Sequence, residues 1–323
     1  MRILITGAAG FIGQRLAAAL IKRGNLMRGD VSQAIAGIDL CDLAAPPAMD
    51  APFPVQVVTG DLGDPDFAAS LVDAQYDSIF HLASLLTLVA EQDSARAFAV
   101  NVDALRRMIE GAMNRPRILF TSSIAVFGGV LPDVVDETVP PGPATTYGSH
   151  KAINELLLAD ASRKGQVDGR SLRLPIVLTR PCPSGSDAGA VSDMVAGIIR
   201  EPLAGGDISV PIRADTPLTV ASARAVVNGL IALHELPASD LPAGRAIHLP
   251  ALTVTPAEMI KSALARGAKG AVEFRPDPQV QAVVDGWPDC FSSVHAGALG
   301  ITGDADFDAV LSDHLDSGKG GQP

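Results

Sequence analysis

Tyr147 and Lys151 are the residues whose types and spacing carry the clearest chemistry in this sequence. They stand four apart in a segment with a helical pattern, so both side chains project from one face of the helix. A free phenol has a pKa of about 10, too high for a base at neutral pH. An ammonium one turn away favours the phenolate, so we expect Lys151 to lower the pKa of Tyr147 and make it a general base.

Ser123 is the third catalytic candidate, at the end of the run Phe120-Thr121-Ser122-Ser123. This run has the pattern of a strand, and ligands of open α/β sheets bind outside the carboxyl ends of the strands. We expect the Ser123 hydroxyl to hydrogen-bond the same substrate oxygen that Tyr147 deprotonates. A plain turn at the end of the strand is the alternative, and it suits Thr121 and Ser122 better than Ser123.

A glycine-rich turn follows the first apolar run, Arg2–Thr6, and opens an amphipathic stretch. Gly7 permits a tight turn, Gly10 lets the backbone approach a diphosphate, and Gly13 lets a helix lie close to a sheet. Phosphates would then accept N–H groups at the positive end of that helix. The pattern predicts a dinucleotide-binding turn made of Gly7, Gly10, Phe11, Ile12 and Gly13.

An acidic residue after the second strand would bind the adenine ribose and repel a 2′-phosphate, which favours NAD over NADP. Asp39 is the preferred candidate. Because Arg28–Ser32 reads as an inserted loop, the interval from the glycines is long and Asp42 is a rival. Asp61 and Leu62, after the third strand, could bind the adenine amino group, although a helix cap or turn also explains Asp61.

Short apolar runs alternate with helical patterns through the first half of the chain, which predicts an α/β fold with a Rossmann-type doubly wound parallel sheet. From Arg180 onward, Pro and Gly become frequent and the elements shorter. We expect an NAD-binding domain at 1–179, a smaller C-terminal substrate lobe at 180–316 interleaved with the last elements of the sheet, and a flexible tail at 317–323. The expected strands are Arg2–Thr6, Ala34–Leu40, Val55–Thr59, Ser78–Leu82, Arg117–Thr121 and Ser171–Leu178, and the main expected helices are Gly13–Arg23, Ser94–Asn114 and Thr146–Lys164.

The glycine turn, Phe80-His81-Leu82-Ala83, Asn101 and the Ser123–Tyr147–Lys151 set together resemble the extended short-chain dehydrogenases/reductases of the NAD-dependent epimerase/dehydratase type. The resemblance implies NAD as cofactor, with Leu82, Ala83, Asn101, Tyr147 and Lys151 beside it. It also implies a homodimer through a four-helix bundle built from the helices at 94–114 and 146–164. One departure is Phe127-Gly128, where the family often has Tyr-Gly.

Several stretches outside the generic motifs are similar to family members that oxidise small sugar acids. This resemblance implies NAD-linked oxidation of the C2 hydroxyl of a four-carbon sugar acid to the 2-oxo acid. The stretches include Thr121–Gly129, Val167–Arg170, Leu172–Pro175, Ile198–Leu203, His248–Pro250 and Asp304–Asp308.

A small anionic substrate needs a cation for its carboxylate, and a guanidinium can bind it through two hydrogen bonds. Arg180, after the run Ser171–Leu178, is the first choice and Arg224 the second. A salt bridge elsewhere is the alternative for either. Ser84 and Thr87 follow the fourth strand and could meet substrate hydroxyls, although an ordinary helix start explains them equally well.

Two other functions use the same motifs. A nucleotide-sugar epimerase or dehydratase would retain its NAD and would hold a base, commonly by stacking, but aromatic residues make up only 4% of the chain. A non-catalytic NAD-sensing protein is the second alternative, and such proteins tend to lose the Tyr–Lys pair that this chain retains.

The composition excludes several partners. The formal charge of -11 and a pI near 4.9 argue against a nucleic-acid partner. No apolar run reaches the roughly 20 residues of a membrane span, and Met1 leads directly into the first strand, so we expect no signal peptide. Three scattered cysteines indicate a reducing compartment, and we expect a cytoplasmic protein. The six histidines show no metal-ligand spacing, so no metal is expected.

Overall fold

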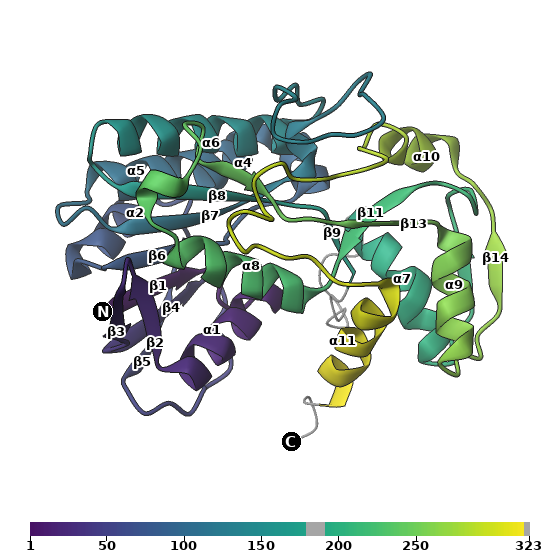
Figure 1. The fold of residues 1–323 in the computed structure, drawn as a ribbon, viewed down its shortest axis with the longest axis horizontal. Helices are drawn as coiled ribbons and strands as arrows, with labels where there is room; N and C mark the ends of the chain where they lie inside the picture. The colour runs from purple at the N-terminus through teal and green to yellow at the C-terminus, as the bar shows by residue number, and fades with distance from the viewer. Residues whose placement is uncertain (179–190, 320–323) are drawn as a thin grey trace.

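A computed structural model describes residues 1–178 and 191–319, and Figure 1 shows how its layers are arranged. Within these residues the central element is a seven-stranded sheet in the order β12-β8-β7-β6-β1-β4-β5. All neighbouring strands in it run parallel. The predicted Rossmann-type sheet is therefore confirmed. Its strands are β1 (Arg2–Thr6), β4 (Gly37–Asp42), β5 (Val55–Thr59), β6 (Ser78–His81), β7 (Arg117–Ser123), β8 (Asp168–Leu174) and β12 (Ala246–His248).

Helices cover both faces of this sheet because both faces of its strands are apolar. Ile3 and Ile5 of β1 pack into a core with two helices on one face, whereas Leu4 between them packs into a second core on the other face. Figure 1 shows the two helix layers with the sheet between them. The first layer holds α1 (Phe11–Arg23) and α8 (Ala223–Glu235), and the second holds α2 (Pro65–Ser70), α5 (Ala104–Glu110) and α6 (Thr146–Arg163).

The second half of the chain builds a smaller lobe at the carboxyl edge of the sheet, on the right in Figure 1. It has its own apolar core, which includes Ile198, Val220 and Met259. Helix α8 and strand β12 return to the large sheet, so the two parts are interleaved in sequence. The lobe contains β9 (Ile176–Val177), β10 (Ile208–Val210), β11 (Leu218–Ala221), β13 (Leu252–Val254), β14 (Val272–Phe274), α7 (Val191–Leu203), α9 (Pro256–Ala265), α10 (Pro278–Val284) and α11 (Phe307–Lys319).

Several elements differ from the sequence expectations. The expected inserted loop is a hairpin of β2 (Asn25–Arg28) and β3 (Val31–Ala34). The single strand expected at 171–178 is split between β8 and β9, because Pro175 has no N–H to donate to a ladder. The expected tail begins as helix, since α11 continues to Lys319, and 320–323 lie outside the described residues.

The expected helix at 94–114 is also divided. It consists of α4 (Ser94–Phe98), a five-residue π-helix at Ala99–Asp103, and α5. A short helix α3 (Thr87–Gln92) precedes it. π-helical insertions of this kind often occur at functional sites.

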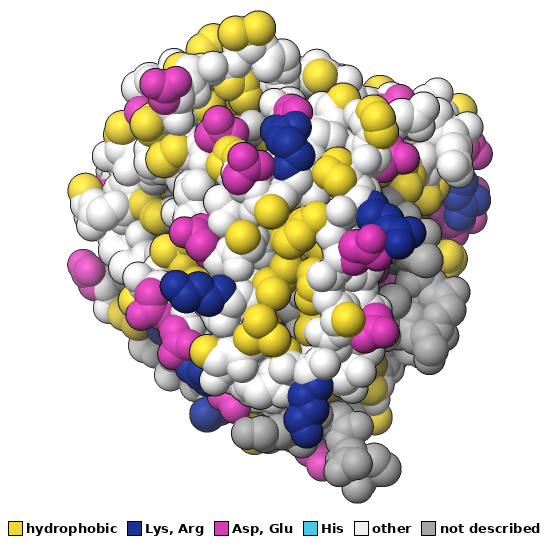
Figure 2. Space-filling view, turned by 90° about the vertical axis from the view of Figure 1, so that its right-hand side faces the viewer, with side chains coloured by type: hydrophobic (Ala, Val, Ile, Leu, Met, Phe, Trp, Pro, Cys, Tyr) yellow, Lys and Arg dark blue, Asp and Glu magenta, His cyan; other side chains and the backbone are white. Residues whose placement is uncertain are grey.

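The surface of the smaller lobe has mixed charge. Figure 2 shows this side with a central strip of hydrophobic side chains, and around it the described Lys and Arg side chains lie singly among Asp and Glu. Among residues 1–178 and 191–319, no helix is long and apolar enough to cross a bilayer.

A buried ion cluster lies at the opposite, amino edge of the sheet. The carboxylate of Asp168 pairs with Arg117 at 2.9 Å and with Arg170 at 2.8 Å, and it also pairs with Arg245. Arg170 donates to the carbonyl oxygens of Leu233 and Leu236 at the end of α8. Burial opposes ionisation of Asp168, but Arg170 and Arg117 outweigh it and lower the pKa to about 2. The cluster therefore fixes α8 to the edge of the sheet.

We predict that Asp168→Ala lowers the free energy of unfolding by about 3–5 kcal/mol, because it leaves buried guanidinium groups without a counter-charge. Since the folded pKa lies below the unfolded value of about 3.9, this contribution is complete above that value and is lost as the pH falls toward 2. Urea unfolding at several pH values measures both effects. Asp160→Ala removes an exposed carboxylate on α6 and serves as the control. An equally small effect of both substitutions would contradict this role.

Candidate active site

The glycine turn joins β1 to α1 at the carboxyl edge of the sheet. Gly7 has a φ of +73°, a conformation that L-residues rarely adopt, and a Cβ there would lie 2.7 Å from the Ala83 nitrogen. A Cβ on Gly13 would overlap the Gly7 carbonyl oxygen. No side chain at the N-cap, Gly10, accepts from the N–H groups of the first turn, where Phe11 and Ile12 lie. This cradle of bare backbone donors fits a diphosphate.

The structure places Asp39 and Asp42 differently with respect to the glycine turn. Asp39 lies within β4 and its carboxylate accepts from the Tyr76 hydroxyl at 2.5 Å and pairs with Arg2 at 3.2 Å, toward the amino end of β1. Asp42 is the last residue of β4 and accepts from the Ala9 N–H at 2.8 Å, inside the glycine turn. Strand β4 runs two residues beyond the predicted end at Leu40, so Asp42 and not Asp39 stands at its carboxyl end. Asp42 is the carboxylate that lies at the glycine turn.

Asp61 and Leu62 follow β5 as the sequence predicts. The Asp61 carboxylate accepts from the Gly63 N–H at 2.8 Å and pairs with Arg96 at 3.1 Å, and Leu62 is buried. Asp61 is thus a turn residue held by a partner from α4.

Leu82 and Ala83 follow β6 and lie against the glycine turn. Their N–H groups approach the carbonyl and the hydroxyl oxygen of Thr6, at 3.1 and 3.4 Å. Since a Cβ on Gly7 would collide with this segment, the two segments form one continuous wall at the carboxyl edge.

Asn101 lies on the π-helix and is buried. Its amide accepts from the Leu85 N–H at 2.7 Å and donates to the Leu85 carbonyl at 3.0 Å, and it hydrogen-bonds the Ser84 hydroxyl at 3.2 Å. Thr87, three residues after Ser84, begins α3. Asn101 therefore fixes the loop that presents Ser84 and Thr87.

Ser123, Tyr147 and Lys151 come together where α6 packs on the end of β7. Ser123 is the last residue of β7, and its hydroxyl interacts with that of Tyr147 near the start of α6. The Lys151 ammonium donates to the Thr121 carbonyl oxygen at 2.7 Å and lies 5.3 Å from the centre of the Tyr147 ring. Helix α6 approaches closely because Gly148 has no Cβ, which would overlap the Ala125 carbonyl oxygen.

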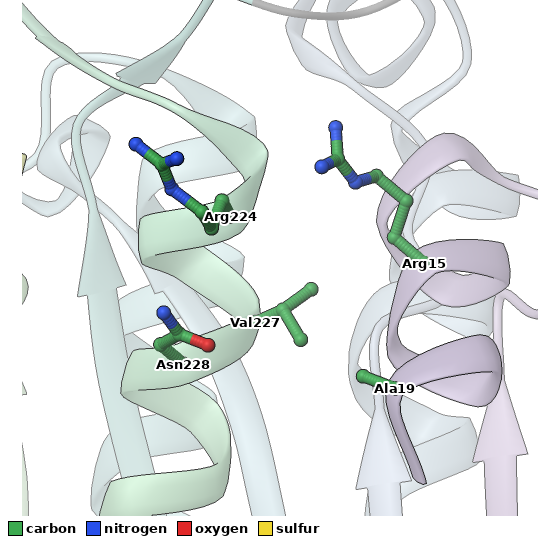
Figure 3. Close-up of a pocket in the computed structure, with 5 residues that line it drawn as sticks. All are labelled: Arg15, Ala19, Arg224, Val227 and Asn228. Carbon is green, nitrogen blue, oxygen red and sulfur yellow. The ribbon is translucent and has the colours of Figure 1, made fainter. Parts of the chain in front are cut away.

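The two arginine candidates for a substrate carboxylate have different outcomes. Arg180 lies outside the described residues. Arg224 lies 3.6 Å from Asp304 and donates to the Ala309 carbonyl at 3.3 Å. Figure 3 shows it at a cavity of about 150 Å³ between α1 and α8, which Arg15, Ala19, Val227 and Asn228 also line. Neither Ser123 nor Tyr147 lines that cavity, so the structure does not bring Arg224 into the catalytic group.

The part of the chain that the structure describes offers no metal site. Within residues 1–178 and 191–319, no three His, Cys, Asp or Glu side chains are placed to hold an ion.

Comparison with known proteins decides the family. The sequence profile of the NAD-dependent epimerase/dehydratase family matches residues 3–216, more than half of the chain. The chain belongs to this family. It is an NAD-dependent oxidoreductase, and its cofactor is NAD.

The relatives of this chain carry two kinds of name, dehydrogenase and epimerase. The chain is 42% identical to D-erythronate dehydrogenase of Cupriavidus necator, over 98% of each sequence. It is 34% identical to D-erythronate dehydrogenase of Haemophilus influenzae, over 98% of the chain and 99% of that protein. A solved structure described as a nucleoside-diphosphate-sugar epimerase from Agrobacterium tumefaciens matches with a TM-score of 0.88 and 32% identity, over 100% of this chain and 95% of the other.

The electrostatics of this epimerase/dehydratase-family site differ from the sequence expectation. Burial raises the pKa of Tyr147 to about 12, and the group that lowers it is the Ser123 hydroxyl, not Lys151. Burial also lowers the pKa of Lys151 to about 7, and Glu155 opposes this shift. The reason is geometric, because the ammonium lies over the Tyr147 ring and donates to a backbone carbonyl.

Sequence reasoning missed a group of buried polar residues beside the catalytic set. Glu155 of α6 accepts from the Ser122 hydroxyl and pairs with Arg173 of β8, which also contacts His248 of β12. The spacing of four between Lys151 and Glu155 is visible in the sequence. The strand that supplies the partner of Glu155 is not visible in the sequence, because Arg173 comes opposite Ser122 only when β7 pairs with β8.

We predict that Ser123→Ala lowers kcat/KM for alcohol oxidation about 100-fold at pH 7. The hydroxyl lowers the pKa of Tyr147, so its removal raises that pKa and reduces the fraction of phenolate at every pH below it. Steady-state kinetics from pH 6 to 10, below the pKa of about 12, measure this loss. Ser70→Ala, whose hydroxyl donates to the Phe67 carbonyl on the exposed side of α2, is the control. A kcat/KM that stays at the wild-type value would remove Ser123 from the ionisation of Tyr147.

Proposed function

We propose that this protein oxidises the C2 hydroxyl of a small sugar acid, a four-carbon aldonate like D-erythronate, to the 2-oxo acid. The observation that carries the proposal is the convergence of Ser123, Tyr147 and Lys151 at the carboxyl edge of the sheet, the edge that also carries the glycine turn. The two curated relatives named D-erythronate dehydrogenase, which match over almost the whole chain, support the substrate class. In this proposal residues 1–179 mainly hold NAD and 180–316 mainly hold the substrate.

Three residues of the chain carry the proton transfer. Tyr147 takes the proton of the C2 hydroxyl, and Ser123 holds the same oxygen through a hydrogen bond as the carbonyl forms. Lys151 places a positive charge beside the phenolate and holds the nicotinamide ribose. Bound NAD supplies a hydride acceptor, so the products are the 2-oxo acid and NADH. With the pKa of Tyr147 near 12, the reactive phenolate becomes more abundant as the pH rises.

NAD selectivity is assigned to Asp42. Its carboxylate lies at the glycine turn, held by the Ala9 N–H at 2.8 Å. There it would accept from the adenine ribose hydroxyls and repel a 2′-phosphate. Gly7, Gly10, Phe11, Ile12 and Gly13 would hold the diphosphate, and Asp61, Leu62, Leu82, Ala83 and Asn101 would line the rest of the dinucleotide.

The substrate residues proposed are Ser84, Thr87, Ser123, Tyr147 and Arg180. Asn101 holds the loop that presents Ser84, and this supports contacts with the substrate hydroxyls. The carboxylate is assigned to Arg180, because Arg224 has carboxylate and carbonyl partners near α11.

The similarity to the Agrobacterium structure, described as a nucleoside-diphosphate-sugar epimerase, raises nucleotide-sugar epimerisation as a second candidate. Such an enzyme commonly holds the base of its substrate by stacking it on an aromatic ring. Phe274, Trp287 and Phe307 pack against the apolar core of the smaller lobe, and Phe291 is buried within it. The placement of these rings favours the free sugar acid.

A homodimer through the helices of residues 94–114 and 146–164 is part of the proposal. Leu156 of α6 is 72% exposed and Phe98 of α4 is 41% exposed, and large apolar side chains exposed together indicate a protein interface. Leu88 and Val89 of α3, which packs on both helices, extend this surface.

We predict that the purified protein forms NADH with D-erythronate, and that Tyr147→Phe lowers kcat by at least 100-fold while NAD binds as in the wild type. Absorbance at 340 nm over a panel of four- to six-carbon aldonates measures the reaction, and calorimetry measures NAD binding. Tyr76→Phe, in the other tyrosine of the chain, is the matched control. Wild-type turnover by Tyr147→Phe would refute the base role, and NADH formation with none of the aldonates would refute the substrate class.

We predict that Asp42→Asn weakens NAD binding about tenfold and reduces the preference over NADP, because a neutral amide repels the 2′-phosphate less. Asp39→Asn should leave NAD affinity unchanged, since its partners Tyr76 and Arg2 lie toward the amino edge of the sheet. Calorimetric titration with both dinucleotides measures this. The reverse pattern would restore Asp39 as the ribose-binding residue.

A further inference from the structure

Helix α6 presents three functional groups in one row to the end of β7. Tyr147, Lys151 and Glu155 are spaced by four residues, so they lie on one face of the helix. Each meets one of three consecutive residues of β7. Tyr147 interacts with the Ser123 hydroxyl, Lys151 donates to the Thr121 carbonyl, and Glu155 accepts from the Ser122 hydroxyl. The third contact has no part in the chemistry proposed above.

Glu155 is held in one position by a partner from the neighbouring strand. Both of its carboxylate oxygens accept from the Arg173 guanidinium, at 2.8 and 2.7 Å, and both side chains are at most 7% exposed. A buried carboxylate with two charged hydrogen bonds and a hydroxyl donor is fixed and ionised.

A second layer supports Arg173. Its guanidinium lies 5.1 Å from the centre of the Phe127 ring and hydrogen-bonds His248 Nε2 at 3.0 Å. Since Arg173 donates there, Nδ1 carries the proton of the neutral imidazole and donates to the Ser292 carbonyl at 2.8 Å. Burial lowers the pKa of His248 to about 4, so the ring is neutral at neutral pH. The Phe127 that departs from the family pattern therefore packs under this guanidinium.

We propose that Glu155, clamped by Arg173, is a positioning residue of the active site, which fixes the Ser122–Ser123 backbone against α6 and keeps the Lys151 side chain charged. This proposal rests on the catalytic roles proposed for Ser123, Tyr147 and Lys151.

The environment of Lys151 explains why a nearby carboxylate matters. From β7 it meets the Phe120 ring, at 4.6 Å, and the Thr121 carbonyl. From β6 it faces His81, whose pKa burial lowers to about 3, and on α6 it faces Tyr147 and His150. These groups are neutral at neutral pH, so they offer no counter-charge. Glu155, itself facing Arg173 and Ser122, supplies one, and it opposes the loss of the proton from Lys151.

The proposed reaction requires an ionised Tyr147 and a protonated Lys151. These two requirements conflict unless Lys151 retains its proton. Tyr147 ionises only at high pH, because its pKa is raised, whereas the ammonium of Lys151 is lost as the pH rises. A fixed carboxylate raises the pKa of Lys151 and so increases the fraction of molecules in which the phenolate and the ammonium coexist. The hydrogen bond between Ser122 and Glu155 alone, which only holds the backbone in place, would not have this effect.

The test uses the double variant Glu155→Gln/Arg173→Gln, which removes both charges of the pair, so that neither Glu155 nor Arg173 remains as an unpaired buried ion. The ¹³Cε resonance of Lys151, assigned among the six lysines with Lys151→Met, reports its protonation directly. We expect the pKa of Lys151 to fall by about one unit in the double variant. Because the pKa of Lys151 lies below that of Tyr147, kcat/KM at neutral to alkaline pH should then fall about tenfold.

Asp193→Asn/Arg200→Met is the matched control, because it removes an ion pair of the smaller lobe with an N–O distance of 2.9 Å. It should leave the Lys151 titration and kcat/KM unchanged. Unchanged values for both in a folded Glu155→Gln/Arg173→Gln protein would overturn the proposal. Ser122→Ala removes only the hydrogen bond to Glu155. It should lower kcat several-fold without moving the Lys151 titration, and a wild-type kcat would overturn the positioning role. The NMR titration needs no substrate, so it stands even if the protein does not oxidise D-erythronate.

Discussion

The packing of α6 on the last residues of β7 is the contact on which the rest of the active site depends. It removes an ammonium and a phenol from water, and buried polar groups of this kind are stable only with partners. The Thr121 carbonyl accepts from Lys151 at 2.7 Å, and the Ser123 hydroxyl meets Tyr147. The same burial that raises the pKa of Tyr147 lowers that of Lys151, so the reactive pair is controlled by its neighbours and not by the pair alone.

The sheet brings the remaining parts to the same edge. The strands are parallel, so the glycine turn after β1, Asp42 at the end of β4 and Ser123 at the end of β7 all lie at carboxyl ends. Asn101 connects the loop after β6 to the helices that follow, and Glu91 of α3 accepts from the Thr146 N–H at 2.7 Å at the start of α6. The helix that carries Tyr147 is thus tied to the loop assigned to the substrate.

The sequence predicted the parts that depend on local pattern. Apolar runs that alternate with amphipathic stretches predicted the parallel sheet, and the spacing of Tyr147 and Lys151 placed both on one helix face. The choice between Asp39 and Asp42 depends on where β4 ends, and a strand boundary is set by pairing with β1 and β5. The sequence predicted a lowered pKa for Tyr147, whereas burial raises it. Burial cannot be seen in a spacing of residues.

Contacts between distant segments could not be predicted from the sequence, because they too depend on the tertiary structure. Glu155 stands in register with Lys151 on the helix, but its partner Arg173 comes from a strand 18 residues further along. Arg224 was a candidate because a guanidinium suits a carboxylate, and only the fold shows that its partners include Asp304, near α11. Residue type suggested the chemistry, whereas the location of each side chain required the tertiary structure.

The most direct test of the central claim follows the hydrogen at C2 of the substrate. D-erythronate carrying deuterium at C2 is incubated with the enzyme and NAD, and the products are analysed by NMR and mass spectrometry. A dehydrogenase built around Tyr147 places the deuterium at C4 of the nicotinamide in free reduced cofactor, one for each 2-oxo acid formed. Deuterium that stays in the sugar acid, or returns to it with no net reduced cofactor, would contradict the account.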